Sequence, residues 1–229
     1  MDKYIYLLLS LLLLFIWLAF FFLLKNEFRK IIIKTSIVGG LTGLIAEFWY
    51  FKDYWHPPSL FGNTKISLED FLVGFAFTGI ALTVYKVFFK KENKRYEKEH
   101  RIIFFIFFVI GIFSLLLFNN LLKINSIFVS SFAFLAISLI MVIIRKDLIV
   151  QSIMSGTLSL LIIIPIYGLL FNFLSPAYWD KYWLLANTAF GVKVIGSIPV
   201  TELLCYFSWG CFAGIAYDFY YGNKDKVLR

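Results

Sequence analysis

The sequence is poor in charge and in the residues that bind metals or form disulfides. Charged residues make up 16% of its 229 positions, whereas soluble domains have about a quarter. Two cysteines, Cys205 and Cys211, are too few for a disulfide framework or a metal cage. The two histidines, His56 and His100, belong to no HExxH motif. These absences argue against a transition-metal enzyme, and we expect no metal site.

Motifs for nucleotides and cofactors are absent as well. The chain has neither a G-x-G-x-x-G sequence nor a glycine-rich phosphate loop. It also lacks the Asp-rich DxxxD motif with which diphosphate-handling prenyltransferases hold magnesium. We therefore expect no bound cofactor and no nucleotide, flavin or diphosphate chemistry.

Long hydrophobic runs dominate what is present. Hydrophobic residues make up 61% of the chain, and several runs approach the roughly 20 residues that cross a bilayer core. A backbone in hydrocarbon must satisfy its own hydrogen bonds, so these runs predict helices. The first run lacks an A-x-A-like cleavage site and is expected to be a span. The sequence thus predicts an all-α polytopic membrane protein with about seven transmembrane helices, at about 4–24, 31–51, 67–89, 102–122, 125–144, 148–174 and 197–221.

The positive charge follows the topology of such a protein. The net charge is +8, and six of the 22 basic residues lie in the segment 90–101. A basic loop between spans is a usual topology signal, so we expect no nucleic-acid partner. Six Lys and Arg residues fall on one side of the predicted spans and fourteen on the other. This bias predicts a multi-pass cell-membrane protein with its N-terminus outside and its C-terminus in the cytoplasm.

Two short motifs indicate an internal duplication. ISLEDFL at 66–72 and IPVTELL at 198–204 each open a predicted span, at an offset of 132 residues. The same offset, without a gap, aligns Asp70 with Glu202 and Tyr85 with Tyr217. We therefore predict a first repeat at 1–101, a connecting span at 102–123 and a second repeat at 124–229. The repeats are expected to be parallel and related by an axis near the membrane normal, which brings equivalent helix starts around one cavity.

Three acids fall at a similar depth in these spans. Glu47 lies about one turn before the outer end of the second span, and Asp70 and Glu202 lie about one turn inside the third and seventh. With the rise of an α-helix, all three are roughly 5 Å below the outer interface. Acids in a span face the protein interior, and burial beside other acids favours the protonated form that a general acid needs.

Helix capping is the alternative explanation for some of these acids. Acids at a helix N-terminus complement the helix dipole and cap free N–H groups. Glu69, beside Ser67, fits that position well, and capping or a structural ion pair is also open for Asp70 and Glu202. Glu47 lies near a helix C-terminus, where the dipole opposes a negative charge, so capping does not explain it.

Polar and aromatic residues near the same face are candidates for substrate binding. Trp49, Trp55 and Trp183 lie near the outer ends of spans. Such residues commonly form an interfacial belt, but their ring faces also stabilise a cation by about 2 kcal/mol when it is desolvated. His56 lies in an HPP turn, which it is expected to order, with a binding role as the alternative. Asn172 follows Pro165 in the sixth span and is expected to line the same cavity.

The two motifs resemble those of the small integral-membrane lycopene β-cyclases, in the form that fuses two similar halves in one chain. Glu69 and Asp70 match the acidic pair of the first half. Glu202 matches one acid of the second half, and Pro199 matches its proline. The chain departs from the family pattern at Ser67, where the first half has proline, and at Thr201, where the second has its first acid.

The resemblance implies a redox-neutral cyclisation of a lipophilic polyene or isoprenoid within membrane lipid. A carboxylic acid protonates a terminal alkene, the carbocation closes to a six-membered ring, and a base removes a proton. The catalytic residues would come from Glu47, Glu69, Asp70 and Glu202. The alternatives are a non-enzymatic transporter or lipophilic carrier, with acids at several depths, and a structural membrane protein whose acids are caps. The exact substrate, the number of ends cyclised, the catalytic competence, the division of roles among the carboxyls and the oligomeric state do not follow from the sequence.

Overall fold

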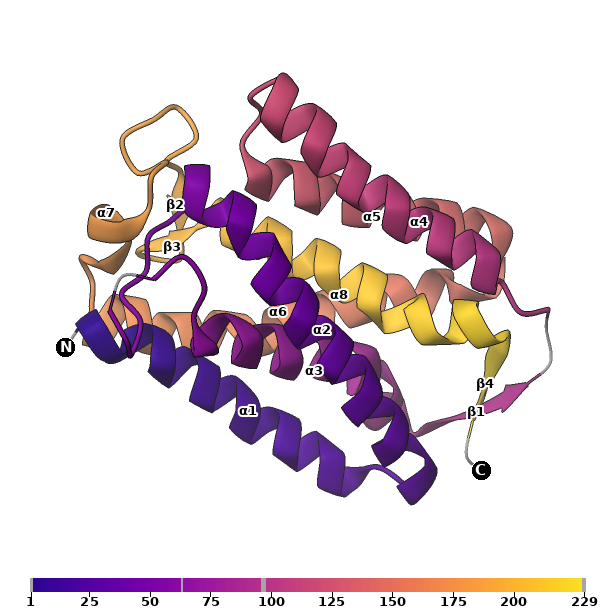
Figure 1. The fold of residues 1–229 in the computed structure, drawn as a ribbon. Coiled ribbons are helices and arrows are strands. Elements are labelled where there is room, and N and C mark those ends of the chain that lie inside the picture. The colour runs from indigo at the N-terminus through magenta and orange to yellow at the C-terminus, as the bar shows by residue number, and fades with distance from the viewer. Residues whose placement is uncertain (1, 63, 96–97, 228–229) are drawn as a thin grey trace.

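The computed structural model describes residues 2–62, 64–95 and 98–227, and it is a bundle of long helices that run side by side (Figure 1). All of them connect the end that holds the N-terminus with the end that holds the C-terminus. The long helices are α1 (Ile5–Leu23), α2 (Asn26–Asp53), α3 (Leu68–Phe89), α4 (Arg101–Ser114), α5 (Ser126–Ile144), α6 (Ile149–Tyr167) and α8 (Val200–Tyr221). The all-α polytopic architecture predicted from the sequence is confirmed.

Six helices of the described part are long and apolar enough to cross a membrane. They are Asp2–Leu23, Phe28–Asp53, Leu68–Phe89, Arg101–Leu121, Ser126–Ile144 and Lys146–Leu174. Two of these continue an α-helix through a π-helical segment, Leu115–Leu121 after α4 and Gly168–Leu174 after α6. The seventh expected span is α8, which is not among the six because it carries Glu202, Asp218 and several tyrosines.

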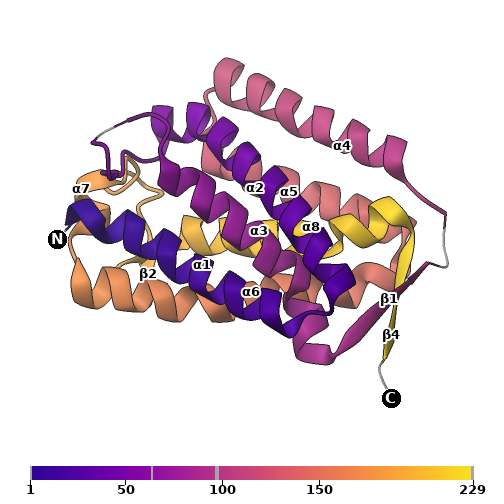
Figure 2. The ribbon, with the colours of Figure 1, turned by 60° about the horizontal axis from the view of Figure 1, so that its bottom comes forward.

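The helices α3 and α8 form the centre of the bundle and pack against each other. Helices α1 and α2 pack against α3, and α5 and α6 pack against α8. Helix α4 lies at the outside, against α5 and α8 (Figure 2). These two central helices carry the buried charged residues Glu69, Asp70, Lys86, Glu202 and Asp218.

Glycines let the outer helices approach the central ones. An added Cβ at Gly39 of α2 would lie 2.7 Å from the carbonyl oxygen of Gly74 in α3. An added Cβ at Gly156 of α6 would lie 2.9 Å from the carbonyl oxygen of Phe207 in α8. Close backbone contact through small residues is how membrane helices associate without a hydrophobic driving force between them.

The helices α3 and α8 have the same length. Their bounds, Leu68–Phe89 and Val200–Tyr221, differ by 132 residues at both ends. Each helix ends at a residue in the left-handed conformation, Lys90 with φ 49° and Gly222 with φ 67°.

Short strands follow these two helices, where the sequence predicts only a charged loop. Strand β1 (Lys91–Arg95) pairs antiparallel with β4 (Asn223–Val227), and Asn93 is the partner of Asp225 at the centre of the ladder. Of the predicted loop at 90–101, residues 96 and 97 lie outside the described part.

Two long loops fold over the end of the bundle that holds the N-terminus. The first connects α2 with α3, and the second connects the segment Gly168–Leu174 with α8. The second contains the short helix α7 (Tyr178–Tyr182) and the strands β2 (Lys193–Val194) and β3 (Ile198–Pro199). Trp55 of the first loop stacks on Trp179 of the second with ring centroids 6.1 Å apart. Trp55, Trp179 and Trp183 are buried. These tryptophans pack the two loops together, whereas an interfacial belt faces lipid headgroups.

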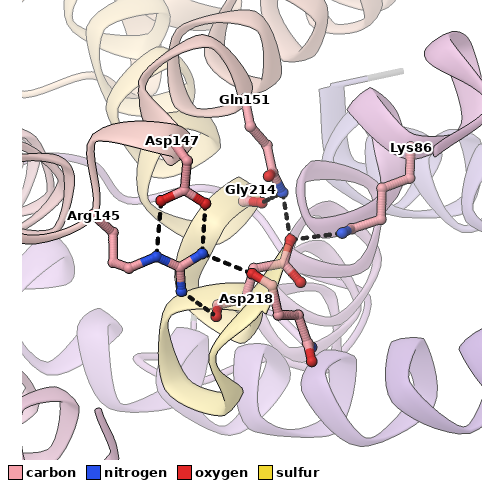
Figure 3. A network of polar contacts seen from close by, with 7 residues as sticks. Lys86, Arg145, Asp147, Gln151, Gly214 and Asp218 are labelled. Atoms are coloured by element: carbon pink, nitrogen blue, oxygen red, sulfur yellow. Dashed lines mark hydrogen bonds and ion pairs between the residues drawn. The ribbon is translucent and has the colours of Figure 1, made fainter. Parts of the chain in front are cut away.

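A buried polar network joins the helices at the opposite end (Figure 3). Lys86 of α3 and Asp218 of α8 form an ion pair at 2.6 Å, with both side chains almost wholly buried. The amide of Gln151 donates to the same Asp218 oxygen at 2.6 Å. Arg145 donates to the Asp218 carbonyl oxygen at 3.4 Å and pairs with Asp147 at 2.6 Å. This network holds α3, α6 and α8 together.

We expect Gly156→Ala to lower the thermal stability of the protein in detergent. The added methyl group would lie 2.5 Å from the Cys211 sulfur and 2.9 Å from a backbone oxygen, and overpacking of this kind costs about 1–3 kcal/mol. Gly111→Ala is the matched control, because an added Cβ there meets nothing within 4 Å and alanine favours a helix over glycine by about 1 kcal/mol. Equal melting temperatures for the two variants would contradict the close α6–α8 contact.

Candidate functional site

An apolar cavity runs along the inner side of the bundle. Its volume is about 310 Å³, and it lies between α2, α3, α4, α5 and α8. On α8, residues at helical spacing face it from Glu202 to Ala216, which is about 21 Å of helix. Its acidic residues all lie near the end covered by the two loops, and they are Glu47, Asp70 and Glu202.

Glu202 is held by two tyrosines from outside its own helix. The hydroxyl of Tyr54 donates to Oε1 at 2.5 Å, and the hydroxyl of Tyr167 donates to Oε2 at 2.6 Å. The Tyr54 oxygen also lies 3.0 Å from the Thr201 hydroxyl, and the Tyr167 oxygen lies 3.0 Å from the Tyr206 hydroxyl. Both carboxyl oxygens are thus satisfied without water or a basic residue.

Asp70 is held by a capping box and by a third tyrosine. The Ser67 hydroxyl accepts from the Asp70 backbone N–H at 3.2 Å, and the Ser67 backbone N–H donates to Asp70 Oδ2 at 2.7 Å. The Tyr6 hydroxyl of α1 donates to the other oxygen, Oδ1, at 2.5 Å. Asp70 therefore caps α3 and lines the cavity at the same time.

Glu47 is the least constrained of the three acids. It is buried in the last third of α2. Among the described residues, the Trp55 indole N–H is its one hydrogen-bond donor, at 3.3 Å from Oε1. This carboxyl is therefore held more loosely than Asp70 and Glu202.

Glu69 lies outside the cavity and does not cap α3, contrary to the expectation for this residue. It is buried, and its Oε1 accepts from the Leu60 backbone N–H at 2.7 Å, which ties the first loop to α3. The N-cap is Ser67 and its capping-box partner is Asp70, because the third position of a helix, and not the second, points back to the N-cap N–H.

The substrate-binding candidates divide into two groups. Trp49 and Trp55 line the cavity, whereas His56, Asn172 and Trp183 are not among its lining residues. The His56 ring nitrogen Nε2 lies 2.6 Å from the Phe51 carbonyl oxygen. The side chain of Asn172 binds the backbone of Ile195 and of Ser197, at 2.9 and 2.8 Å. These two residues order loop structure, and a binding role for the five residues stays a prediction.

Sequence reasoning missed the tyrosines that hold the acids. Tyr6, Tyr54 and Tyr167 come from three different segments, and only the folded chain brings them to Asp70 and Glu202. It also missed Trp209, which lines the cavity near Tyr206 with ring centroids 6.5 Å apart and 9° between the planes. Of these residues, only Tyr206 and Trp209 could have been found from the sequence, because they follow Glu202 at helical spacing.

The comparison with known families finds a match in the second half of the chain. Residues 125–220 match the family model described as lycopene cyclase. Over these residues the chain is similar to the lycopene cyclase family. The match includes α5, α6 and α8, and with them Tyr167 and Glu202. No curated protein and no solved structure matches the chain.

This similarity to the lycopene cyclase family supports a carotenoid cyclase-like function and a lipophilic carotenoid substrate. The apolar helices of the described part and the family together support a membrane protein. The apolar cavity with carboxyls near one end fits both conclusions.

We expect Tyr167→Phe to destabilise the protein. The change removes the phenol that donates to buried Glu202, and a hydrogen bond to a charged group contributes about 1.5–3 kcal/mol. The measurement is the melting temperature of the purified protein in detergent.

Tyr178→Phe is the matched control for this experiment. Tyr178 is equally buried, and its hydroxyl has no hydrogen-bond partner among the described residues. Burial raises the pKa of Tyr178 well above its ordinary value, so the control removes no charge. Equal losses of stability in the two variants would refute a specific support of Glu202 by Tyr167.

Proposed function

We propose that the chain is a lycopene β-cyclase that works by protonation of a terminal alkene and closure of the resulting carbocation. The observation that carries the proposal is that Glu47, Asp70 and Glu202, from both halves of the chain, line one apolar cavity. The reaction needs a proton donor, a base and a dry apolar pocket in the same place. The family match over residues 125–220 supports this assignment.

In this mechanism Glu47 is the general acid. Asp70 and Glu202 each accept hydrogen bonds on both carboxyl oxygens, an arrangement that stabilises a carboxylate. Glu47 has a single, longer hydrogen bond among the described residues. It is therefore the carboxyl best suited to stay protonated and to release its proton to a substrate.

The steps balance in protons and electrons. The Glu47 proton adds to the terminal double bond of the polyene and leaves a tertiary carbocation. A neighbouring double bond of the same end attacks this centre, forms a ring carbon–carbon bond and moves the positive charge into the ring. Asp70 or Glu202 takes a proton from the adjacent ring carbon to form the ring alkene. No oxidant or reductant is needed: Glu47 gives one proton, Asp70 or Glu202 takes up one proton, and a proton transfer from that carboxyl back to Glu47 restores the starting state.

Aromatic rings beside the acids stabilise the intermediate cation in this scheme. Trp49, Trp55, Tyr206 and Trp209 line the cavity. A desolvated cation above a tryptophan face gains about 2 kcal/mol. The same rings exclude water, which would otherwise capture the carbocation as an alcohol.

We further infer that the chain is the fused form with two repeats. The equal lengths of α3 and α8 at an offset of 132 residues support this inference. Two pairs at that offset also touch, the ion pair Lys86–Asp218 and the strand pair Asn93–Asp225. Equivalent residues meet in this way only on a twofold axis, so these pairs mark an axis between the repeats.

We place the acid end of the cavity toward the outside of the cell. The basic residues are more numerous at the opposite end of the predicted spans, and such residues stay in the cytoplasm. The carrier alternative requires polar groups along a route across the membrane. The cavity has its acids near one end and apolar walls beyond them, which favours the cyclase.

Expression in a lycopene-accumulating bacterial host tests the proposal. We expect the wild-type chain to convert lycopene to a product with a β-ring, detected by chromatography. Glu47→Gln should lower the yield at least about 100-fold, because glutamine keeps the shape of the side chain but supplies no proton. Asp70→Asn and Glu202→Gln should lower it as well.

Asp180→Asn is the control for these acid variants. Asp180 is an exposed acid at the same end of the molecule, paired with Lys193, and this change should leave the yield intact. Unchanged lycopene at good expression of the wild-type chain would exclude the cyclase and favour the carrier. Full activity of Glu47→Gln would exclude Glu47 as the acid.

A further inference from the structure

The cavity is open at its side, toward the region that lipid chains occupy. Val38 and Ile45 of α2 line it and are nevertheless 58% and 45% exposed. Phe108 of α4 lines it and is 46% exposed. Side chains that both line a cavity and face the outside mark its mouth, so the mouth lies between α2 and α4. Every one of these residues is apolar.

The acid end of the cavity is closed by polar contacts across the same two helices. Lys52 at the end of α2 donates to Asn119 and Asn120 at 3.1 Å. Asp53 accepts from the Asn119 amide and, at 2.6 Å, from the Ser126 hydroxyl. These bonds join α2 to the segment between α4 and α5 and close this end of the gap to water.

Away from this closure, α2 and α4 separate. Both views show the two helices diverging toward the end with β1 and β4 (Figures 1 and 2). Of the described residues of α4, Phe107 is the buried one. Helix α4 is thus held at its ends and by one face, and its side toward α2 is open.

Gly111 lies in the middle of this open side. It lines the cavity, and a Cβ added there would meet nothing within 4 Å. Glycine costs a helix about 1 kcal/mol relative to alanine, and no close helix contact requires it here. This glycine differs from Gly39 and Gly156, which allow backbones to approach. Its effect is to leave the passage between α2 and α4 wide.

We propose that the polyene enters sideways from the bilayer between α2 and α4, and that Gly111 sets the width of this entrance. The inference rests on the proposed cyclase function and adds the route by which substrate reaches the acids. The cavity extends about 21 Å along α8, whereas the bilayer core is roughly 30 Å thick. One end group of the polyene reaches the carboxyls, and the rest of the polyene lies along the cavity and extends out through the entrance.

A size series at Gly111 tests this route. Gly111→Ala should retain activity, and Gly111→Leu should lose part of it. Gly111→Phe should lower the yield of cyclic product about tenfold or more, because its side chain fills the space through which the polyene enters. Val109→Phe is the matched control. Val109 lies on the same helix, is 49% exposed and does not line the cavity, so a phenylalanine there should change the yield less than about twofold.

A binding measurement separates this inference from the cyclase assignment. The Glu47→Gln protein is purified from the lycopene-producing host with and without Gly111→Phe, and the retained lycopene is quantified by its absorbance per mole of protein. We expect Gly111→Phe to reduce retained lycopene about tenfold at an unchanged melting temperature.

The outcomes are distinct. If the wild type is active, and Gly111→Phe and Val109→Phe give the same yield and the same retained pigment, the proposed entrance is overturned. The cyclase assignment then still stands. Wild-type protein that retains lycopene, loses it on Gly111→Phe and makes no ring would overturn the cyclase and support the entrance. A lower melting temperature for Gly111→Phe than for Val109→Phe would overturn the finding that this position faces open space.

Discussion

The desolvation of carboxyl groups is the constraint on which the rest of the structure depends. An acid within the apolar part of a bundle cannot form hydrogen bonds with water, and burying it without other partners costs several kcal/mol. The chain meets this cost with neutral donors: three tyrosines, one serine and one tryptophan serve Asp70, Glu202 and Glu47. A basic partner would have neutralised the acids and removed their use in proton transfer. Tyrosine hydroxyls donate hydrogen bonds to the carboxyl oxygens without adding a positive charge beside them.

The two halves of the chain contribute differently to this arrangement. Glu47 and Asp70 come from the first half, and Glu202 comes from the second, so neither half holds the full set. The partners are unequal as well, since Asp70 uses a capping box whereas Glu202 uses Tyr54 and Tyr167. In the proposed duplication, two equal sites became one site with separate roles. The buried Lys86–Asp218 pair joins α3 and α8 at the opposite end of the bundle.

The proposed carbocation chemistry also requires the exclusion of water, and the two loops cover the end of the cavity that holds the acids. Trp55, Trp179 and Trp183 pack the two long loops on each other above the acids. The contacts of Lys52 and Asp53 close the neighbouring gap. Water is thus kept from the end where the acids lie, while the apolar side of the cavity faces lipid. Closure toward water and openness toward lipid suit a substrate that never leaves the bilayer.

Composition and run length alone determine that this protein is a helical bundle for a membrane, because hydrocarbon accepts only backbones that satisfy themselves. The offset of 132 residues also singled out Asp70 and Glu202, since a duplicated polar residue stands out in an apolar sequence. The sequence did not distinguish Glu69 from Asp70, or Trp49 and Trp55 from His56, Asn172 and Trp183. Neighbours in a chain point to different sides of a helix or loop, and which side meets the cavity depends on how distant segments pack. Tyr6, Tyr54 and Tyr167 reach the acids only through that packing, so the tertiary structure alone decided which carboxyls accept several hydrogen bonds and which one has a single donor among the described residues.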